Sequence, residues 1–506
     1  MFTLGCGTRC RGPYPDLVPN RRLRPPAAAP TAIDFAAVRE RLGVPTGYPA
    51  DAVAEAVAAV AHPPVPALDR TDLPLVTIDP VGSMDLDQAM YLSRNGSGYR
   101  VCYAIADVAS FVPPSGPLQR ETWARGETLY SPDLATPLHP RELSEGAASL
   151  LPDQARPAVL WTIDLGPDGE PVAVDLQRAL VRSVARLDYV GVQADLDAGR
   201  SHPSIELLPE IGRLRAQAAR RRHAITLDLP DAEVVQAPDG HWTLSLRAQS
   251  EIEQANAEIS LLTGICAARI MLDGGTGLLR TLPPAAARDL AALRASAATL
   301  GISWPDGQPA GDLIAGLDAA DPKVAAFLDD AVHLLRGAGY TPFTGGTPPE
   351  QPLHAGVGGT YAHVTAPLRR LADRYATEVC LALHAGTPVP GWAAEALPEL
   401  PAVMAASARR ASDLDRQCTG AVSVFLLSGR EGDEFEATVL QVDTERNRAT
   451  VLLTEPPVRA HCSATSLVEG SRSMVRLVSV DPATSSFVVE PVGDPLPDGP
   501  VQLVAG

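Results

Sequence analysis

The run Thr77-Ile-Asp-Pro-Val-Gly-Ser-Met-Asp-Leu-Asp-Gln-Ala-Met90 places three aspartates within nine residues, between two apolar segments typical of strands. Side chains alternate in an extended segment, so Asp85 and Asp87 are expected to point the same way, and a Pro/Gly turn can bring Asp79 beside them. Such carboxylates repel one another unless a divalent cation holds them, and Mg²⁺ or Mn²⁺ favours oxygen ligands. The spacing alone leaves two interpretations open: a metal site suited to attack on a phosphodiester, or an Asp-rich loop that caps turns and faces water.

The composition is typical of a globular protein: 506 residues, 45% of them hydrophobic and 20% charged, with a mean hydropathy of +0.02. We find no uncharged apolar stretch of about 18 residues, and the first residues lack the apolar region of a signal peptide. We therefore expect neither a membrane span nor secretion. The seven cysteines are scattered, which favours a reducing cytoplasm over a disulfide framework.

The formal net charge of −18 argues against a protein whose whole surface attracts nucleic acid. Phosphate binding needs only a local basic lining, however, and arginines gather in residues 213–223 and 369–374. For the first of these clusters, a solvated helix face is an equally good interpretation. An acidic exterior around a basic channel would favour capture of a strand end over broad non-specific binding.

The pattern of residues divides the chain into five segments. Residues 1–30, rich in Pro, Arg and Ala, predict a disordered tail, and residues 31–70 predict a small helical module resembling a helix-turn-helix. Residues 71–426 carry strand patterns followed by long helices, 427–495 carry the short regular strands of a small β-barrel, and 496–506 are a tail. The expected fold class is α+β. The expected strands are 75–79, 86–93 and 99–106, and the expected helices are 207–222, 249–272, 285–300, 322–337, 363–385 and 402–417.

Several motifs in this order resemble the ribonuclease II (RNB) family of 3′→5′ exoribonucleases. They are Thr77-Ile-Asp-Pro80, Asp85-Leu-Asp87, Tyr103-Ala-Ile-Ala-Asp-Val-Ala-Ser-Phe-Val112, Arg125-Gly-Glu-Thr-Leu-Tyr-Ser-Pro132, Leu143-Ser-Glu-Gly-Ala-Ala-Ser-Leu150, Arg156-Pro157 and Tyr361-Ala-His-Val-Thr-Ala-Pro-Leu-Arg-Arg-Leu-Ala-Asp373. The resemblance implies an RNB catalytic domain, with a β-sheet core and surrounding helices, followed by an S1-like OB-fold RNA-binding domain. It also implies that the protein hydrolyses single-stranded RNA processively from the 3′ end to nucleoside 5′-monophosphates, using Mg²⁺.

The run at 77–90 contains the residues that we expect to bind metal and to act in catalysis. Asp87 is expected to be the essential catalytic carboxylate, binding metal and helping to activate water, with Asp79 and Asp85 as further metal ligands. Gln88 stands where the family usually has a second aspartate. Its neutral amide can ligate only through the carbonyl oxygen, so a preference for Mn²⁺ or a loss of activity is open.

The remaining site residues lie outside that run. Thr365 as a cap and Pro367 in the first turn would place Arg369 at a helix start, where it can clamp the scissile phosphate. Arg370 is left open between an RNA contact and an ion pair with Asp373. The resemblance implies that Tyr130 stacks on the terminal base, against the alternative of a core tyrosine, and that Glu258 contacts the terminal nucleotide.

Two departures from the family pattern leave alternatives open. Gln88 supports a catalytically impaired RNA-binding or regulatory protein that keeps the fold. Only 78 residues precede Asp79, too few for the two cold-shock barrels of familiar bacterial members, so a different N-terminal element must guide RNA. A DNA-binding regulator acting through residues 32–62 is a further alternative, although that module is better explained by packing against the next domain.

Overall fold

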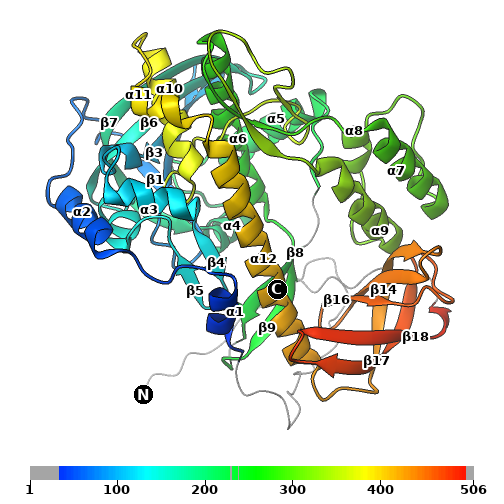
Figure 1. Ribbon diagram of the computed structural model, residues 1–506. Coiled ribbons are helices and arrows are strands. Elements are labelled where there is room, and N and C mark those ends of the chain that lie inside the picture. Colours follow the sequence, from blue (N-terminus) through cyan, green and yellow to red (C-terminus); the bar gives the residue numbers. More distant parts are fainter. Residues whose placement is uncertain (1–32, 228–230, 238, 497–506) are drawn as a thin grey trace.

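A closed barrel of five strands lies at the centre of the larger domain (Figure 1). The computed structural model describes residues 33–227, 231–237 and 239–496. The strands run in the order β1-β2-β3-β6-β7, and every neighbouring pair is antiparallel except β7 with β1. Their bounds are β1 Leu75–Asp79, β2 Gln88–Asn95, β3 Gly98–Ala106, β6 Ala155–Leu165 and β7 Pro171–Asp188.

The length of β7 explains why the sheet closes. Residues 171–182 of this strand pair with β6, and residues 183–188 pair in parallel with β1. One strand therefore serves two neighbours in succession, which removes both sheet edges. The last pair, Asp79 with Asp188, puts Asp79 on the rim of the barrel. The sequence predicted a β-sheet core with surrounding helices, and closure of that sheet into a barrel was not anticipated.

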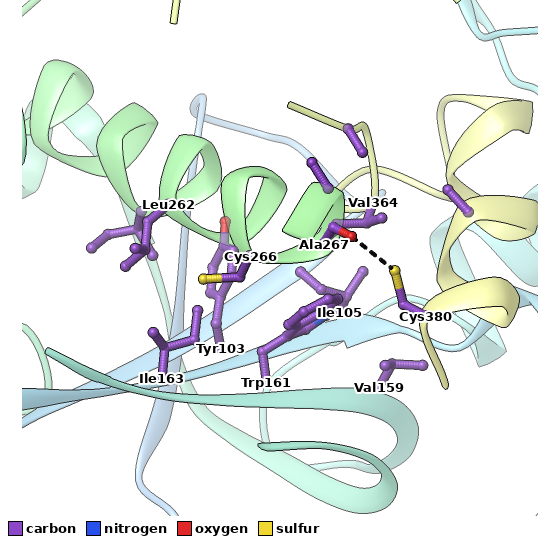
Figure 2. Packing of buried hydrophobic residues seen from close by; sticks show 14 of the residues in the cluster. Tyr103, Ile105, Val159, Trp161, Ile163, Leu262, Cys266, Ala267, Val364 and Cys380 are labelled. Atoms are coloured by element: carbon purple, nitrogen blue, oxygen red, sulfur yellow. Dashed lines mark hydrogen bonds between the residues drawn. The ribbon is translucent and has the colours of Figure 1, made fainter. Parts of the chain in front are cut away.

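Two helices cover this barrel, α6 (Glu251–Asp273) and α10 (Leu371–His384). Figure 2 shows Tyr103 and Trp161 of the barrel packed beneath Cys266 and Ala267 of α6, with Cys380 of α10 beside them. The Cys380 thiol donates to the Ala267 carbonyl at 3.7 Å, so the two helices are in direct contact. Helix α6 begins at a capping box formed by Ser250 and Glu253, which satisfies two otherwise unpaired N–H groups.

Helix α6 must come very close to the segment that carries Tyr361. A side chain at Gly264 would place its Cβ atom 2.1 Å from the Tyr361 ring, so only glycine fits there. In the described part of the chain, α6 is the one helix long and apolar enough to cross a membrane, and 56% of its apolar window is buried in the protein. Burial of that kind is typical of the core helix of a globular domain.

The C-terminal strands form a separate antiparallel sheet in the order β16-β15-β14-β17-β18, and its two end strands contact each other. Helix α12 (Leu400–Leu427) runs from the larger domain to this sheet (Figure 1). The strands are β14 Glu434–Asp443, β15 Arg448–Leu453, β16 Arg459–Cys462, β17 Arg472–Asp481 and β18 Ser486–Leu496. The predicted tails lie outside the described residues, except that β18 includes Leu496.

The remaining elements surround the barrel or connect the two domains. Helices α7, α8 and α9 form a small cluster with its own apolar core. These elements are α1 Phe35–Arg41, α2 Ala50–Ala61, α3 Pro117–Arg125, β4 Leu129–Ser131, β5 Leu134–Thr136, α4 Tyr189–Asp197, α5 Leu208–Arg221, β8 Asp231–Gln236, β9 Trp242–Arg247, β10 Gly277–Thr281, α7 Ala287–Leu300, α8 Ala310–Ile314, α9 Pro322–Ala331, β11 Gly339–Phe343, β12 Leu353–His354, β13 Gly359–Thr360 and α11 Gly391–Ala396. The α+β class and most predicted helices are confirmed.

Candidate active site

The two residues predicted to be catalytic, Asp87 and Arg369, form an ion pair although 282 positions separate them. Asp87 directly precedes β2 and is 1% exposed. Its Oδ1 accepts from the backbone N–H of Leu368 and its Oδ2 accepts from Arg369 Nε, both at 2.7 Å. Burial raises the pKa of the Asp87 carboxyl to about 7, and the Arg369 guanidinium opposes this rise.

Asp79 and Asp85 lie close enough to share this electrostatic environment. Burial raises the pKa of Asp79 to about 6, Arg369 opposes the rise, and the negative charge of Asp85 adds to it. One carboxylate oxygen of Asp79, Oδ2, is buried and has no hydrogen-bond partner among the described residues. Asp85 is half-buried, and its Oδ2 accepts from the Tyr130 hydroxyl at 3.3 Å. The three aspartates and Arg369 therefore meet at the rim of the barrel.

This group of side chains fits a divalent cation in part. A buried carboxylate oxygen without a partner among the described residues, beside a second carboxylate, provides hard oxygen ligands of the kind that Mg²⁺ and Mn²⁺ prefer, so Asp79 and Asp85 fit. Asp87 differs, because protein donors already bind both of its oxygens. As the side chains stand, no group of three Asp, Glu, His or Cys residues within the described ranges could hold a metal ion.

Gln88 faces the segment before α10. Its Nε2 donates to the backbone carbonyl of Thr365 at 2.5 Å. The amide therefore fixes the turn that carries Arg369, and this hydrogen bond ties the start of β2 to that turn. Metal binding through the Gln88 carbonyl oxygen stays a prediction.

The predicted helix start at Thr365 and Pro367 is wrong, because α10 begins only at Leu371. Residue 370 has extended backbone angles, φ −140° and ψ 120°, and residues 366–370 form a turn. The carboxylate of Asp373 accepts from the Ala366 N–H, and that of Asp87 accepts from the Leu368 N–H. These two buried acids therefore stabilise a turn here instead of the start of a helix. Arg369 is thus presented by a turn rather than by the first helical turn.

Arg370 forms the ion pair that the sequence left open. Its Nε and Nη2 donate to the two oxygens of the fully buried Asp373, at 2.6 and 2.8 Å. This bidentate geometry is the strong form of an arginine–carboxylate pair. The two adjacent arginines therefore point to different acids, Arg369 to the barrel rim and Arg370 to its own helix.

Tyr130 is the aromatic residue of the site, and it is not a core tyrosine. It lies on the hairpin of β4 and β5, is 53% exposed, and its hydroxyl reaches Asp85. Burial of the hydroxyl and the nearby acids raise the pKa of Tyr130, while Arg369 opposes the rise. An exposed ring beside the carboxylates is available for a flat ligand such as a base.

Glu258 does not join this group of side chains. Burial raises the pKa of Glu258, and the charges that oppose the rise belong to Arg215 and Arg222. Glu258 is two residues from Asn256 on α6, and two residues turn an α-helix by about 200°. The opposite face of α6 points to the site instead.

Sequence reasoning missed residues on that opposite face and beside it. The Asn256 amide donates to the Tyr189 hydroxyl at 2.9 Å, and the Ser260 and Tyr103 hydroxyls are 2.8 Å apart. Burial raises the pKa of Tyr189 to about 12, and the charge of Asp79 adds to this rise, so this tyrosine lies near the acidic rim. The i, i+4 spacing of Asn256 and Ser260 in an apolar helix was the available signal.

Comparison with known proteins places this arrangement in a family. A model described as the RNB domain matches residues 68–383, and one described as the RNase II-type exonuclease C-terminal S1 domain matches residues 433–492. Ribonuclease R of Escherichia coli (strain K12) is 30% identical over 321 residues, which cover 60% of this chain. The chain spans only 39% of the length of that relative.

Solved structures share the fold at lower identity. The apo form of Mycoplasma genitalium RNase R has a TM-score of 0.80 at 19% identity and covers 90% of this chain and 77% of its own. The same protein has been solved with ribose-methylated single-stranded RNA and with double-stranded RNA. Yeast Ssd1, described as a pseudonuclease, has a TM-score of 0.65 at 19% identity and covers 83% of this chain and 55% of its own. Because the RNB match extends over more than half of the 506 residues, the protein belongs to the RNB domain family, with an RNase II-type S1 domain at its C-terminal end.

Proposed function

We propose that the protein is a 3′→5′ exoribonuclease that hydrolyses single-stranded RNA processively to nucleoside 5′-monophosphates. The observation that carries this proposal is the meeting of three aspartates, Arg369 and an exposed Tyr130 at one rim of the barrel. Carboxylates, a guanidinium and a free aromatic face are the groups that a phosphodiester and its terminal base require. The family relationship supports the same reaction.

Each protein side chain has a defined task in this proposal. Arg369 is 41% exposed, so its guanidinium can contact the scissile phosphate while Nε keeps its bond to Asp87. Asp87 holds the guanidinium in place, and as a buried base it can accept a proton from the attacking water. Tyr130 stacks on the terminal base, which is worth about 1–3 kcal/mol per base.

Asp79 and Asp85 would hold Mg²⁺ or Mn²⁺, with Asp87 beside them. A cation bound there supplies Lewis acidity at the phosphate and lowers the pKa of a bound water. Burial raises the pKa of Asp79 and Asp87 well above the ordinary aspartate value of 3.8, because it disfavours their negative charge. A bound cation would offset this effect and stabilise both carboxylates in their charged form. Gln88 would be a further ligand through its carbonyl oxygen, since its amide nitrogen already donates to the Thr365 carbonyl.

The test uses single-stranded RNA with Mg²⁺ or Mn²⁺, labelled at the 5′ end to follow shortening and, in a second sample, at its internal phosphates to identify the released nucleotides. We expect stepwise shortening from the 3′ end and release of nucleoside 5′-monophosphates. Asp87→Asn and Arg369→Ala should each slow the reaction by about 100-fold or more, the usual cost of losing one transition-state contact. Arg41→Gln, on the exposed face of α1, is the matched control and should keep the wild-type rate. Continued shortening after a chase of unlabelled RNA measures processivity.

A catalytically impaired RNA-binding protein is the second candidate. It is favoured by Gln88, whose amide nitrogen bonds a backbone carbonyl, and by the fold shared with a protein described as a pseudonuclease. Fluorescence anisotropy with labelled RNA separates the candidates. Tight binding of single-stranded RNA without any turnover in Mg²⁺ or Mn²⁺ would reject the enzyme and support the binding protein.

A further inference from the structure

We infer that the N-terminal module positions the base-stacking tyrosine, with Arg39 of α1 as the positioning residue. The inference rests on the proposed stacking role of Tyr130 and goes beyond it. The relevant contacts fall on the β4–β5 hairpin, residues 129–136, and on Pro137 directly after it, and this hairpin carries Tyr130 toward Asp85. Helix α1 and the linker after it touch this hairpin at its tip, at its end and on its buried side.

Arg39 binds the tip of the hairpin through hydrogen bonds and an ion pair. This arginine is 6% exposed, its Nη1 donates to Ser131 Oγ at 2.6 Å and also to Asp133 Oδ1, and its Nη2 donates to Asp133 Oδ2 at 3.0 Å. The Ser131 hydroxyl in turn bonds the Leu134 carbonyl at 2.8 Å, across the turn. This bidentate pair, in which Arg39 is nearly buried and Asp133 is partly exposed, fixes the position of the tip.

The linker after α1 holds the other end of the hairpin. The Tyr48 hydroxyl donates to the carbonyl of Pro137, the residue that follows β5, and Arg125 donates to the same carbonyl at 3.2 Å. The Arg125 guanidinium lies 3.8 Å from the centre of the Tyr48 ring and also bonds the Gly47 carbonyl. The chain leaving β5 is therefore fastened to the N-terminal module as well.

Apolar packing holds the hairpin from its buried side. Leu129 is buried in one continuous cluster with Phe35, Val38 and Val44 of the N-terminal module and Leu414 of α12. Because side chains alternate along a strand, burying Leu129 turns the next residue, Tyr130, outward toward the acidic rim. The buried face of α1 is thus occupied by this contact, whereas α2 packs against α3.

If Arg39 only stabilised the fold, its substitution would weaken RNA binding to the same extent whether or not Tyr130 is present. A positioning role instead acts through Tyr130 alone. Two substitutions test it from opposite sides of the ion pair: Arg39→Gln, and Asp133→Asn at a side chain that is 35% exposed. Arg41→Gln is the matched control, since Arg41 lies on the same helix and bonds Gln417 of α12 rather than the hairpin.

The probe is single-stranded RNA with 2-aminopurine as its 3′-terminal base, bound to the full chain without added metal. Stacking on Tyr130 quenches the fluorescence of this base, and the measurement does not depend on turnover. We expect Arg39→Gln and Asp133→Asn each to weaken the quenching and raise the Kd about tenfold, since loss of a stacking contact worth about 1–3 kcal/mol changes the affinity by about that factor or more. Arg41→Gln should change neither quantity.

A double-mutant cycle with Tyr130→Ala decides between the two roles. If Arg39 acts through Tyr130, then Arg39→Gln should change the Kd less than about twofold once Tyr130 is alanine. An equal loss in both backgrounds, or a tenfold change with unaltered quenching, would overturn the inference. Failure of the proposed stacking role is distinguishable, because Tyr130→Ala would then leave wild-type quenching intact, and failure of the proposed hydrolysis appears only as missing turnover in the RNA-shortening assay. If Arg39→Gln unfolds the protein, Asp133→Asn carries the cycle alone.

Discussion

Acid should destabilise the turn that carries Arg369 through one buried histidine, His139. This residue is 2% exposed, and its Nδ1 donates to the carbonyl of Leu368 at 3.2 Å. The N–H group of the same Leu368 binds Asp87, so His139 and Asp87 together hold this residue of the turn that carries Arg369. Burial lowers the pKa of His139 from 6.5 to about 4, the hydrogen bond to Leu368 opposes this fall, and Arg374 and Arg125 add to it.

The direction of the effect follows from proton linkage. Between about pH 6.5 and pH 4 the unfolded chain binds a proton at His139 that the folded protein does not, so acid favours unfolding. The stabilisation is complete above the unfolded pKa and is lost as the pH falls toward the folded pKa. The pKa difference corresponds to a loss of about 2 kcal/mol between pH 8 and pH 5, and of about 3 kcal/mol at pH 4.

The assay is urea unfolding of wild type and His139→Asn at several pH values. Asparagine keeps a donor near the position of Nδ1 and removes the titration. At pH 8 the free energy of unfolding of His139→Asn should be lower than that of wild type. Between pH 8 and pH 5 the variant should lose about 2 kcal/mol less of this free energy than wild type loses. His62→Asn, at an exposed ring, is the control and should keep the wild-type slope. Parallel slopes for wild type and His139→Asn would refute this reasoning.

Three further results are expected. Tyr130→Phe should keep most of the affinity for the RNA 3′ end, whereas Tyr130→Ala should lose about 1–3 kcal/mol in a binding titration, because stacking needs the ring and not the hydroxyl. Arg370→Met should lower the free energy of unfolding by about 3–5 kcal/mol, since it leaves the buried Asp373 carboxylate without its bidentate partner; full stability would contradict that role. Gln88→Glu should cost about 1–3 kcal/mol in thermal unfolding, because it sets a carboxylate against the Thr365 carbonyl, and an unchanged melting temperature would show that this hydrogen bond contributes nothing.

Local pattern predicted the elements of the fold but not their closure. The helical spacing of residues 249–272 and 285–300 gave α6 and α7 within a few residues, because amphipathic periodicity is encoded in neighbouring positions. The barrel depends instead on one long strand finding two partners, β6 and β1, and β1 lies about a hundred residues away in sequence. No local pattern reports such a pairing.

The site shows the same division between local and long-range information. The three aspartates could be predicted from one short run, because a turn between strands is a local event. Arg369 was predicted as a phosphate clamp, but its pairing with Asp87 was not anticipated. The expected helix start before α10 was wrong because buried acids override the helix signal of Thr365 and Pro367. Arg39 carried no sequence signal at all, since its partners on the hairpin are more than 90 positions away.

Helix α12 contacts both domains, and its length therefore affects how the C-terminal sheet is rotated relative to the larger domain. It is 28 residues long without interruption, which corresponds to about 42 Å, and it touches β4 at the hairpin as well as β17 and β18 of the C-terminal sheet. Each residue of an α-helix advances about 1.5 Å and turns about 100°. Inserting a single residue in its middle would therefore swing the C-terminal sheet through more than a quarter turn, whereas inserting seven would nearly restore its bearing at a greater reach. Helix α9 also contacts β14, so the length of α12 and this second contact together set the orientation of the C-terminal sheet.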